Sequence, residues 1–149
     1  MGNYFQLLNL EPVFELDLAA LESAYFNAQR QFHPDRFISK SSTERAAAMQ
    51  RSIDVNQAYN TLKNPLSRAQ YLLQFQGIKV GTEKDNIKPS QALLTEVMEW
   101  REQETPPDLA QVEQESVDSI ASLYKKQDWQ TMALETLRLG YIIKTRADQ

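Results

Sequence analysis

The chain has 149 residues, of which 42% are hydrophobic and only 4 are glycine, a composition typical of one packed domain or two small ones and favourable to an all-α fold. Its net charge of −4 argues against nucleic acid or an anionic membrane as the main partner. The absence of cysteine excludes disulfides and thiolate metal sites, and the presence of only one histidine argues against a conventional zinc site.

The first two helices are predicted from residues 4–10 and from residues 18–32. The second helix has Asp17 as its expected N-cap and must end near Phe32, because the proline at position 34 restricts the chain just before it. Apolar residues recur along it at steps of three and four, which predicts an amphipathic helix. This predicted stripe consists of Leu18, Leu21, Tyr25, Ala28 and Phe32.

A third helix is expected from about residue 42 to Lys63, since Ser41 and Glu44 fit a capping box. Two long amphipathic helices joined by a short loop predict an antiparallel hairpin. Asn64 and Pro65 then read as the N-cap and first residue of a fourth helix. Together these elements predict a helical domain over residues 1–76.

The remainder of the chain predicts a linker over residues 77–88 and a three-helix bundle over residues 89–149. The linker contains two of the four glycines and lacks a helical period. The three helices are expected to follow Ser90, Thr105 and Asp128, and Leu134 is expected on an apolar face of the last one. Lys and Arg balance Asp and Glu up to residue 76, so the whole net negative charge falls in the second half.

The only histidine of the chain occurs in the tripeptide His33-Pro34-Asp35, between the two long helices of the predicted hairpin. Pro34 fixes its own φ angle, and Asp35 can stiffen the turn or present a free carboxylate to a cation. With Arg30 and Arg36 beside it, this tripeptide predicts a rigid polar turn that binds a partner protein.

Two other interpretations of the tripeptide remain open at this stage. It could serve only to end a helix, or His33 and Asp35 could form a catalytic dyad. The dyad needs a nucleophile and a concave pocket, and an exposed hairpin tip provides neither.

The helix predicted after Ser90 carries more apolar residues than one core face requires. Leu93, Val97 and Trp100 form a stripe that is expected to pack inward. Leu94 and Met98 form a second line, about 100° around the helix, which is flanked by acidic residues. One interpretation is a single broad core face; the other is an exposed binding patch, to which adaptable methionine side chains are suited.

Four segments carry a family resemblance: Tyr4-Phe5, Gln29 to Phe37 (QRQFHPDRF), Ile53 to Tyr59 (IDVNQAY) and Asn64 to Leu73 (NPLSRAQYLL). Through them the first half resembles a J domain, specifically that of the HscB family of co-chaperones. The resemblance implies a J domain followed by a C-terminal three-helix bundle, which covers essentially the whole chain. It also implies a role in iron–sulfur cluster assembly in the bacterial cytoplasm.

The resemblance further implies two protein partners and the residues that bind them. His33, Pro34, Asp35, Arg30 and Arg36 would engage an HscA/DnaK-type chaperone and stimulate its ATPase. An IscU-like scaffold protein would be bound by Leu94, Met98, Glu99, Glu102 and Tyr141. Thr95 departs from the family, in which an apolar residue is common at that position.

The chain is therefore predicted to act as a co-chaperone without catalytic residues, cofactor or metal of its own. No glycine-rich phosphate-binding loop is present, which agrees with this prediction. One alternative is a J-domain adaptor for a different client protein, and another is a small helical enzyme. No nucleic acid or membrane partner is expected.

Overall fold

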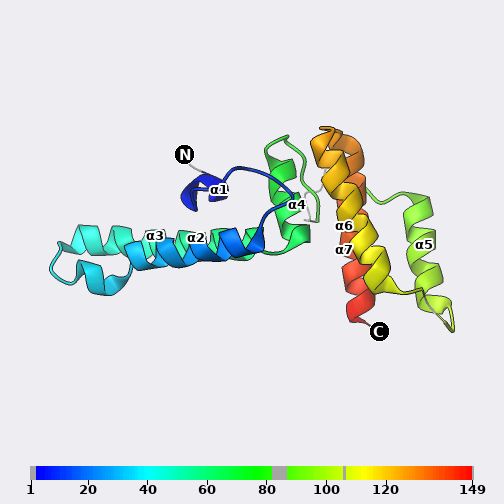
Figure 1. The fold of residues 1–149 in the computed structure, drawn as a ribbon. Helices are drawn as coiled ribbons and strands as arrows, with labels where there is room; N and C mark the ends of the chain where they lie inside the picture. The colour runs from blue at the N-terminus through cyan, green and yellow to red at the C-terminus, as the bar shows by residue number, and fades with distance from the viewer. Residues whose placement is uncertain (1–2, 82–86, 106, 149) are drawn as a thin grey trace. The chain divides into compact units, whose positions relative to one another are not determined.

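The computed structural model describes residues 3–81, 87–105 and 107–148. Among these residues every regular element is a helix, which confirms the predicted all-α fold (Figure 1). The packing divides the chain into two compact units, the first ending at Arg68 and the second beginning at Ala69. None of the helices described is both long enough and apolar enough to cross a lipid bilayer.

The first unit is built around a helical hairpin. It contains α1 (Tyr4–Leu7), α2 (Leu18–Gln31), the 3-10 helix η1 (Pro34–Phe37), α3 (Ser42–Leu62) and the start of α4 (Pro65–Gln74). α2 and α3 lie side by side in opposite directions, as predicted (Figure 1). Side-chain oxygens of Asp17, Ser41 and Asn64 accept backbone hydrogen bonds at the starts of α2, α3 and α4, which explains why the sequence locates these starts well.

The hairpin has a narrow core because only one side of each helix is covered. Leu21 is 1% exposed and Ala28 is 9% exposed, so the centre of the predicted α2 stripe is buried. Leu18 is 56% exposed, contrary to the prediction, because it lies in the first turn of α2, at one edge of the stripe. The other buried apolar residues of the unit are Phe5, Leu8, Phe14, Ala48, Val55, Ala58 and Leu62.

Arg68 stabilises the turn between α3 and α4. Its guanidinium donates a 2.7 Å hydrogen bond to the Leu62 carbonyl, at the end of α3, and lies 5.0 Å from the centre of the Phe14 ring. Burial lowers the pKa of Arg68 from its ordinary value. The carbonyl and the aromatic face stabilise this desolvated cation, which ties the end of α3 to the start of α4.

The second unit contains the C-terminal part of α4 together with α5 (Gln91–Glu102), α6 (Leu109–Lys125) and α7 (Trp129–Ala147). α6 and α7 form an antiparallel hairpin, and α5 packs on α7. Between α6 and α7 the chain reverses through Gln127, whose φ is +58°, and Asp128 caps α7. The largest fully buried side chains of this hairpin are Ile120, Met132, Leu139, Ile142, Thr136 and Thr145.

Two predictions for the second unit are wrong in detail. α6 begins at Leu109 rather than just after Thr105, because the Asp108 side chain accepts hydrogen bonds from the Ala110 and Gln111 amides and caps the helix there. Leu134 is 48% exposed on α7, although the apolar period predicted it on a packed face.

The linker predicted at residues 77–88 includes residues 82–86, which lie outside the described residues. Before that gap Ile78 and Val80 are 7% and 3% exposed, and the Ile78 amide donates to the Leu73 carbonyl at the end of α4. This segment therefore packs as part of the second unit. The domain limit after residue 76 stays a prediction; by packing alone, the division of the chain falls between Arg68 and Ala69.

Candidate functional site

The His33-Pro34-Asp35 turn is an exposed, internally hydrogen-bonded corner between α2 and α3. His33 is the N-cap of η1, and its Nδ1 accepts a 3.1 Å hydrogen bond from the Asp35 amide. The Arg36 amide donates a second bond, of 3.0 Å, to the His33 carbonyl. Pro34 occupies the first position of η1. A backbone N–H at that position would have no partner within the helix, so proline, which has no N–H, costs no hydrogen bond there. These hydrogen bonds within the turn therefore stiffen it.

His33, rather than Asp35, stiffens the turn. Of the two roles expected for Asp35, stiffening the turn or presenting a carboxylate to a cation, only the second fits its exposed side chain. Because Nδ1 acts as an acceptor, the neutral ring carries its proton on Nε2 and can donate it outward. The His33 and Asp35 side chains are 58% and 81% exposed, and His33 Nδ1 lies 3.6 Å from Asp35 Oδ2. This openness favours recognition of a partner over the catalytic dyad.

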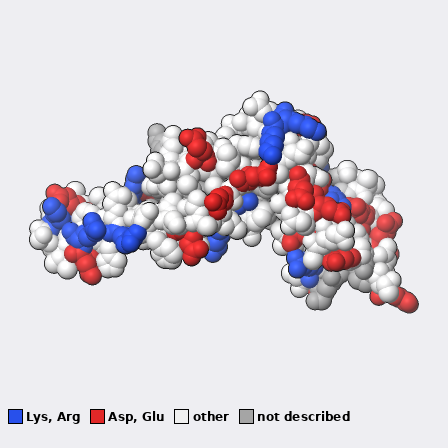
Figure 2. Space-filling view, in the orientation of Figure 1, with Lys and Arg blue, Asp and Glu red and all other residues white. Residues whose placement is uncertain are grey.

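Basic side chains surround the turn. Arg30, near the end of α2, donates a hydrogen bond to Asn27 Oδ1, and Arg36 is exposed on η1. The segment from Arg30 to Arg51 contains five Lys or Arg residues and two Asp or Glu residues. Figure 2 shows Lys and Arg gathered at the free end of the hairpin. Most of this positive charge comes from η1, the following loop and α3, rather than from α2.

A polar cluster that the sequence did not reveal joins α2 to α3 next to the turn. The Gln29 side chain bonds with Ser52 Oγ at 2.8 Å and Asn56 Oδ1 at 3.0 Å. Tyr25 Oη donates to the same Asn56 oxygen at 2.7 Å, and its ring stacks on Tyr59 at 4.2 Å between centroids. Gln29, Asn56 and Tyr59 fall within two of the segments that carry the family resemblance, and that position was the only signal of their role.

The second candidate site is the outer face of α5. Ser90 caps this helix by accepting from the Leu93 amide at 3.1 Å. Leu93, Val97 and Trp100 are 9%, 8% and 7% exposed and form the packed side, as predicted.

On the outer side of the same helix, Leu94 and Met98 are 36% and 57% exposed. Glu99 and Glu102 are exposed as well. The structure thus places these four predicted residues together on one helix, and the interpretation as a single broad core face is wrong for Leu94 and Met98.

Arg138 of α7 fixes the rotation of α5. It donates two hydrogen bonds to the Glu96 carboxylate, at 2.9 and 3.3 Å, and one to Glu135 at 3.1 Å. Its guanidinium also lies 5.7 Å from the centre of the Trp100 ring. These bonds, chiefly those with Glu96, raise the pKa of Arg138. Since Glu96 and Trp100 are one turn apart, Arg138 holds α5 so that Leu94 and Met98 face away from α7.

A double-mutant cycle tests this orientation. Arg138→Gln and Glu96→Gln should each lower the free energy of unfolding, and the double variant should lose less than the sum. The side chains are 26% and 38% exposed, so solvent screening limits the expected coupling to roughly 1 kcal/mol. Additive losses in urea unfolding would contradict the proposed contact.

Trp100 should contribute more to stability than any other residue of α5. Trp100→Ala removes a side chain that is 7% exposed and should lower the free energy of unfolding by about 3–5 kcal/mol. The melting temperature, followed by circular dichroism, should fall by about 10 °C or more. Met98→Ala on the same helix is the control and should have little effect. Equal melting temperatures for the two variants would refute this packing.

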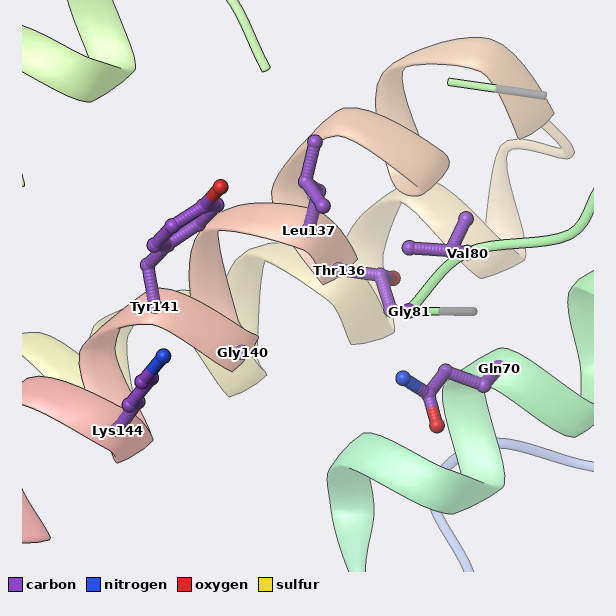
Figure 3. Close-up of a pocket in the computed structure, with 8 residues that line it drawn as sticks. All are labelled: Gln70, Val80, Gly81, Thr136, Leu137, Gly140, Tyr141 and Lys144. Carbon is purple, nitrogen blue, oxygen red and sulfur yellow. The ribbon is translucent and has the colours of Figure 1, made fainter. Parts of the chain in front are cut away.

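Tyr141, the fifth predicted scaffold-binding residue, lies on α7 and is half-buried. It lines a cleft of about 350 Å³ together with Gln70, Val80, Gly81 and Lys144 (Figure 3). None of the residues that line this cleft belongs to α5. The structure therefore places Tyr141 in the same unit as the α5 face without showing a contact between them. Among the residues described, no group of three or more His, Asp or Glu side chains could hold a metal ion.

Comparisons with known proteins agree with this architecture. The DnaJ domain family matches residues 3–71. The co-chaperone protein HscB homologue of Psychromonas ingrahamii is 38% identical over 125 residues, which cover 84% of this chain and 72% of that protein. The homologue of Burkholderia multivorans is 39% identical over 148 residues, which cover 99% of this chain and 81% of that protein.

Solved structures give the same result over nearly the full length. The chaperone HscB from Vibrio cholerae matches with a TM-score of 0.84 and 30% identity, over 99% of this chain and 94% of that one. The human co-chaperone protein HscB matches with a TM-score of 0.83 and 29% identity, over 99% of this chain and 80% of that one. The resemblance inferred from the sequence is thus confirmed: the chain has a J domain and belongs to the HscB family of co-chaperones.

Proposed function

We propose that this protein is a co-chaperone of iron–sulfur cluster assembly that carries an IscU-like scaffold protein to an HscA/DnaK-type chaperone. In this proposal, the His33-Pro34-Asp35 turn, with Arg30 and Arg36, docks on the chaperone and stimulates ATP hydrolysis. The outer face of α5, together with Tyr141 of the same unit, holds the scaffold. The first role belongs to residues 1–76 and the second to residues 89–149.

The observation that carries the proposal is the construction of the turn. Its backbone is fixed by its own imidazole, and the Asp35 carboxylate is 81% exposed. A carboxylate on a rigid turn can form a charge-assisted hydrogen bond to a cationic partner with little loss of conformational entropy. Because the hairpin end is basic, acidic surface on the chaperone would attract it and speed association.

The proposed scaffold site is supported by its composition and by its orientation. Leu94 and Met98 expose apolar surface, and Glu99 and Glu102 add negative charge at its border. Arg138 keeps this surface turned outward. The face therefore suits a partner that offers an apolar patch bordered by basic residues.

The proposal assigns no catalytic step, cofactor or metal to this chain, and no nucleic acid or membrane partner. ATP is hydrolysed by the chaperone, and this protein accelerates that step by binding. We place the process in the bacterial cytoplasm, in line with the bacterial relatives of the chain.

Two measurements on the intact protein test the proposal. The chaperone's steady-state ATPase rate should rise when the protein is added, and it should rise further when the scaffold is also present. Isothermal titration should detect a complex between the protein and the scaffold alone. An unchanged ATPase rate would refute the chaperone role.

The scaffold titration also separates this proposal from an adaptor for another client. If ATPase stimulation is normal while the scaffold does not bind, the protein serves a different client. Binding of an unfolded model peptide in place of the scaffold would identify that client class.

A further inference from the structure

Met98 places an oxidisable sulfur on the exposed side of α5. Its side chain is 57% exposed, whereas Met132, the other methionine of the second unit, is 0% exposed. The chain contains no cysteine, so methionines are its only sulfur-containing residues. Because a dissolved oxidant must reach the sulfur to oxidise it, Met98 is the methionine of this unit that such an oxidant attacks.

Met98 lies at the centre of the surface proposed to hold the scaffold. Leu94 precedes it by one turn of α5 and Glu102 follows it by one turn, so the three side chains lie in one row. Leu94 is 36% exposed and supplies the remaining apolar surface of this row. A chemical change at the Met98 sulfur therefore falls in the part of the face that a bound scaffold would desolvate most.

The surroundings of Met98 on α5 offer acceptors rather than free donors. Glu99 and Glu102 carry carboxylates, which accept hydrogen bonds but do not donate them. Arg101, the only cation of this helix, donates to Asp148 at 3.1 Å. An oxygen added to the Met98 sulfur is one more acceptor on this surface, and it depends on water for its hydrogen bonds.

We infer that Met98 is a modification site, and that its oxidation by hydrogen peroxide to methionine sulfoxide weakens scaffold binding. This inference rests on the function proposed above. In the reaction the Met98 Sδ donates an electron pair to one peroxide oxygen, so that a sulfur–oxygen bond forms as the oxygen–oxygen bond breaks. The sulfur is oxidised by two electrons and the peroxide is reduced. The departing hydroxide takes the proton of the transferred oxygen and leaves as water.

The modification should act on binding and not on folding. In the free protein, water satisfies the new oxygen because the side chain is exposed. An apolar patch on the scaffold would displace that water and offer no donor in return, which weakens the complex. Methionine sulfoxide reductases reverse the oxidation, so the loss of affinity is reversible.

The test oxidises the full-length protein alone and then measures scaffold binding. The protein is treated with hydrogen peroxide, the peroxide is removed with catalase, and untreated scaffold is added in an isothermal titration. Peptide mass mapping should find sulfoxide at Met98 and at the 61% exposed Met49, with Met132 unmodified. The dissociation constant for the scaffold should rise about tenfold, and methionine sulfoxide reductases should restore it.

Two conservative variants locate the effect. Met49→Leu, on α3 and outside the α5 face, should bind the scaffold like wild type before treatment and show the same loss after it. Met98→Leu keeps an apolar side chain but has no sulfur at this position, so its affinity should be the same before and after treatment. The melting temperature of each protein should be the same before and after treatment, since the oxidised side chains are exposed.

Three results would overturn the inference. They are an unchanged scaffold affinity in a protein whose Met98 is shown to be oxidised, an equal loss of affinity in treated Met98→Leu, and oxidation of Met98 no faster than that of Met132. Absence of scaffold binding by the untreated protein is a different result, because it refutes the proposed function itself. Normal binding that survives the oxidation of Met98 refutes only the role of this residue as a modification site.

Discussion

Replacing Asp35 by alanine should abolish stimulation of the chaperone's ATPase and leave the affinity for the scaffold unchanged. The carboxylate is 81% exposed and no hydrogen bond to its oxygens is seen among the described residues, so its removal should not disturb the fold. Truncating one partner of a charge pair in an interface costs roughly 2–5 kcal/mol, which corresponds to a loss in affinity of 30-fold or more. The effect should appear in single-turnover ATP hydrolysis.

The control for this variant is Glu44→Ala. Glu44 is the other acidic residue at the hairpin end, exposed in the first turn of α3. Its loss leaves the turn intact, so stimulation should stay close to that of wild type. Normal stimulation by Asp35→Ala, or equal losses in both variants, would show that the turn does not act through its carboxylate.

The double variant Leu94→Ala, Met98→Ala should weaken scaffold binding by roughly 30-fold or more. The two side chains expose apolar surface at the centre of the proposed face, and truncating a central contact typically costs about 1–2 kcal/mol. Their partial exposure means that the melting temperature should change little. Isothermal titration with the scaffold measures the affinity, and the basal stimulation of the chaperone in the absence of scaffold should be retained.

Leu134→Ala is the matched control for that double variant. Leu134 is 48% exposed on α7, in the same unit, but outside the α5 face. Scaffold affinity should therefore be close to that of wild type. If Leu134→Ala weakens binding and the α5 variant does not, the scaffold binds between α5 and α7 instead, where Leu134 lines a groove.

Local signals in the sequence were enough to locate most helices. Asp17, Ser41 and Asn64 each accept a backbone hydrogen bond at the start of the helix that they were expected to cap, because capping depends on residues only two or three positions away. α6 was misplaced because Asp108 lay close to two prolines and a threonine that looked like an earlier start.

Features that depend on distant neighbours could not be predicted. The apolar period suggested that Leu18 and Leu134 are packed, but periodicity does not show where the covering helix ends. The bond of Glu96 with Arg138 joins residues 42 positions apart, and the sequence showed Glu96 only as part of an acidic run.

The candidate sites show the same contrast between features that local signals predict and features that they do not. The shift of Leu94 and Met98 around α5 relative to Leu93 and Val97 indicated either a broad core face or an exposed patch, and only the structure shows that both side chains are exposed. The role of His33 as the cap of the turn did not follow, because either side chain of the pair could have bonded the backbone.

The central claim is that one chain carries both surfaces and couples them. The most direct test is the chaperone's single-turnover ATPase with the scaffold and an equal mixture of two variants, Asp35→Ala and the α5 double variant. Each variant retains the surface that the other lacks. Tethering on one chain raises the effective concentration of the bound scaffold at the chaperone. We predict that the mixture shows only the basal stimulation of the α5 variant, whereas stimulation equal to that of wild type would contradict the claim.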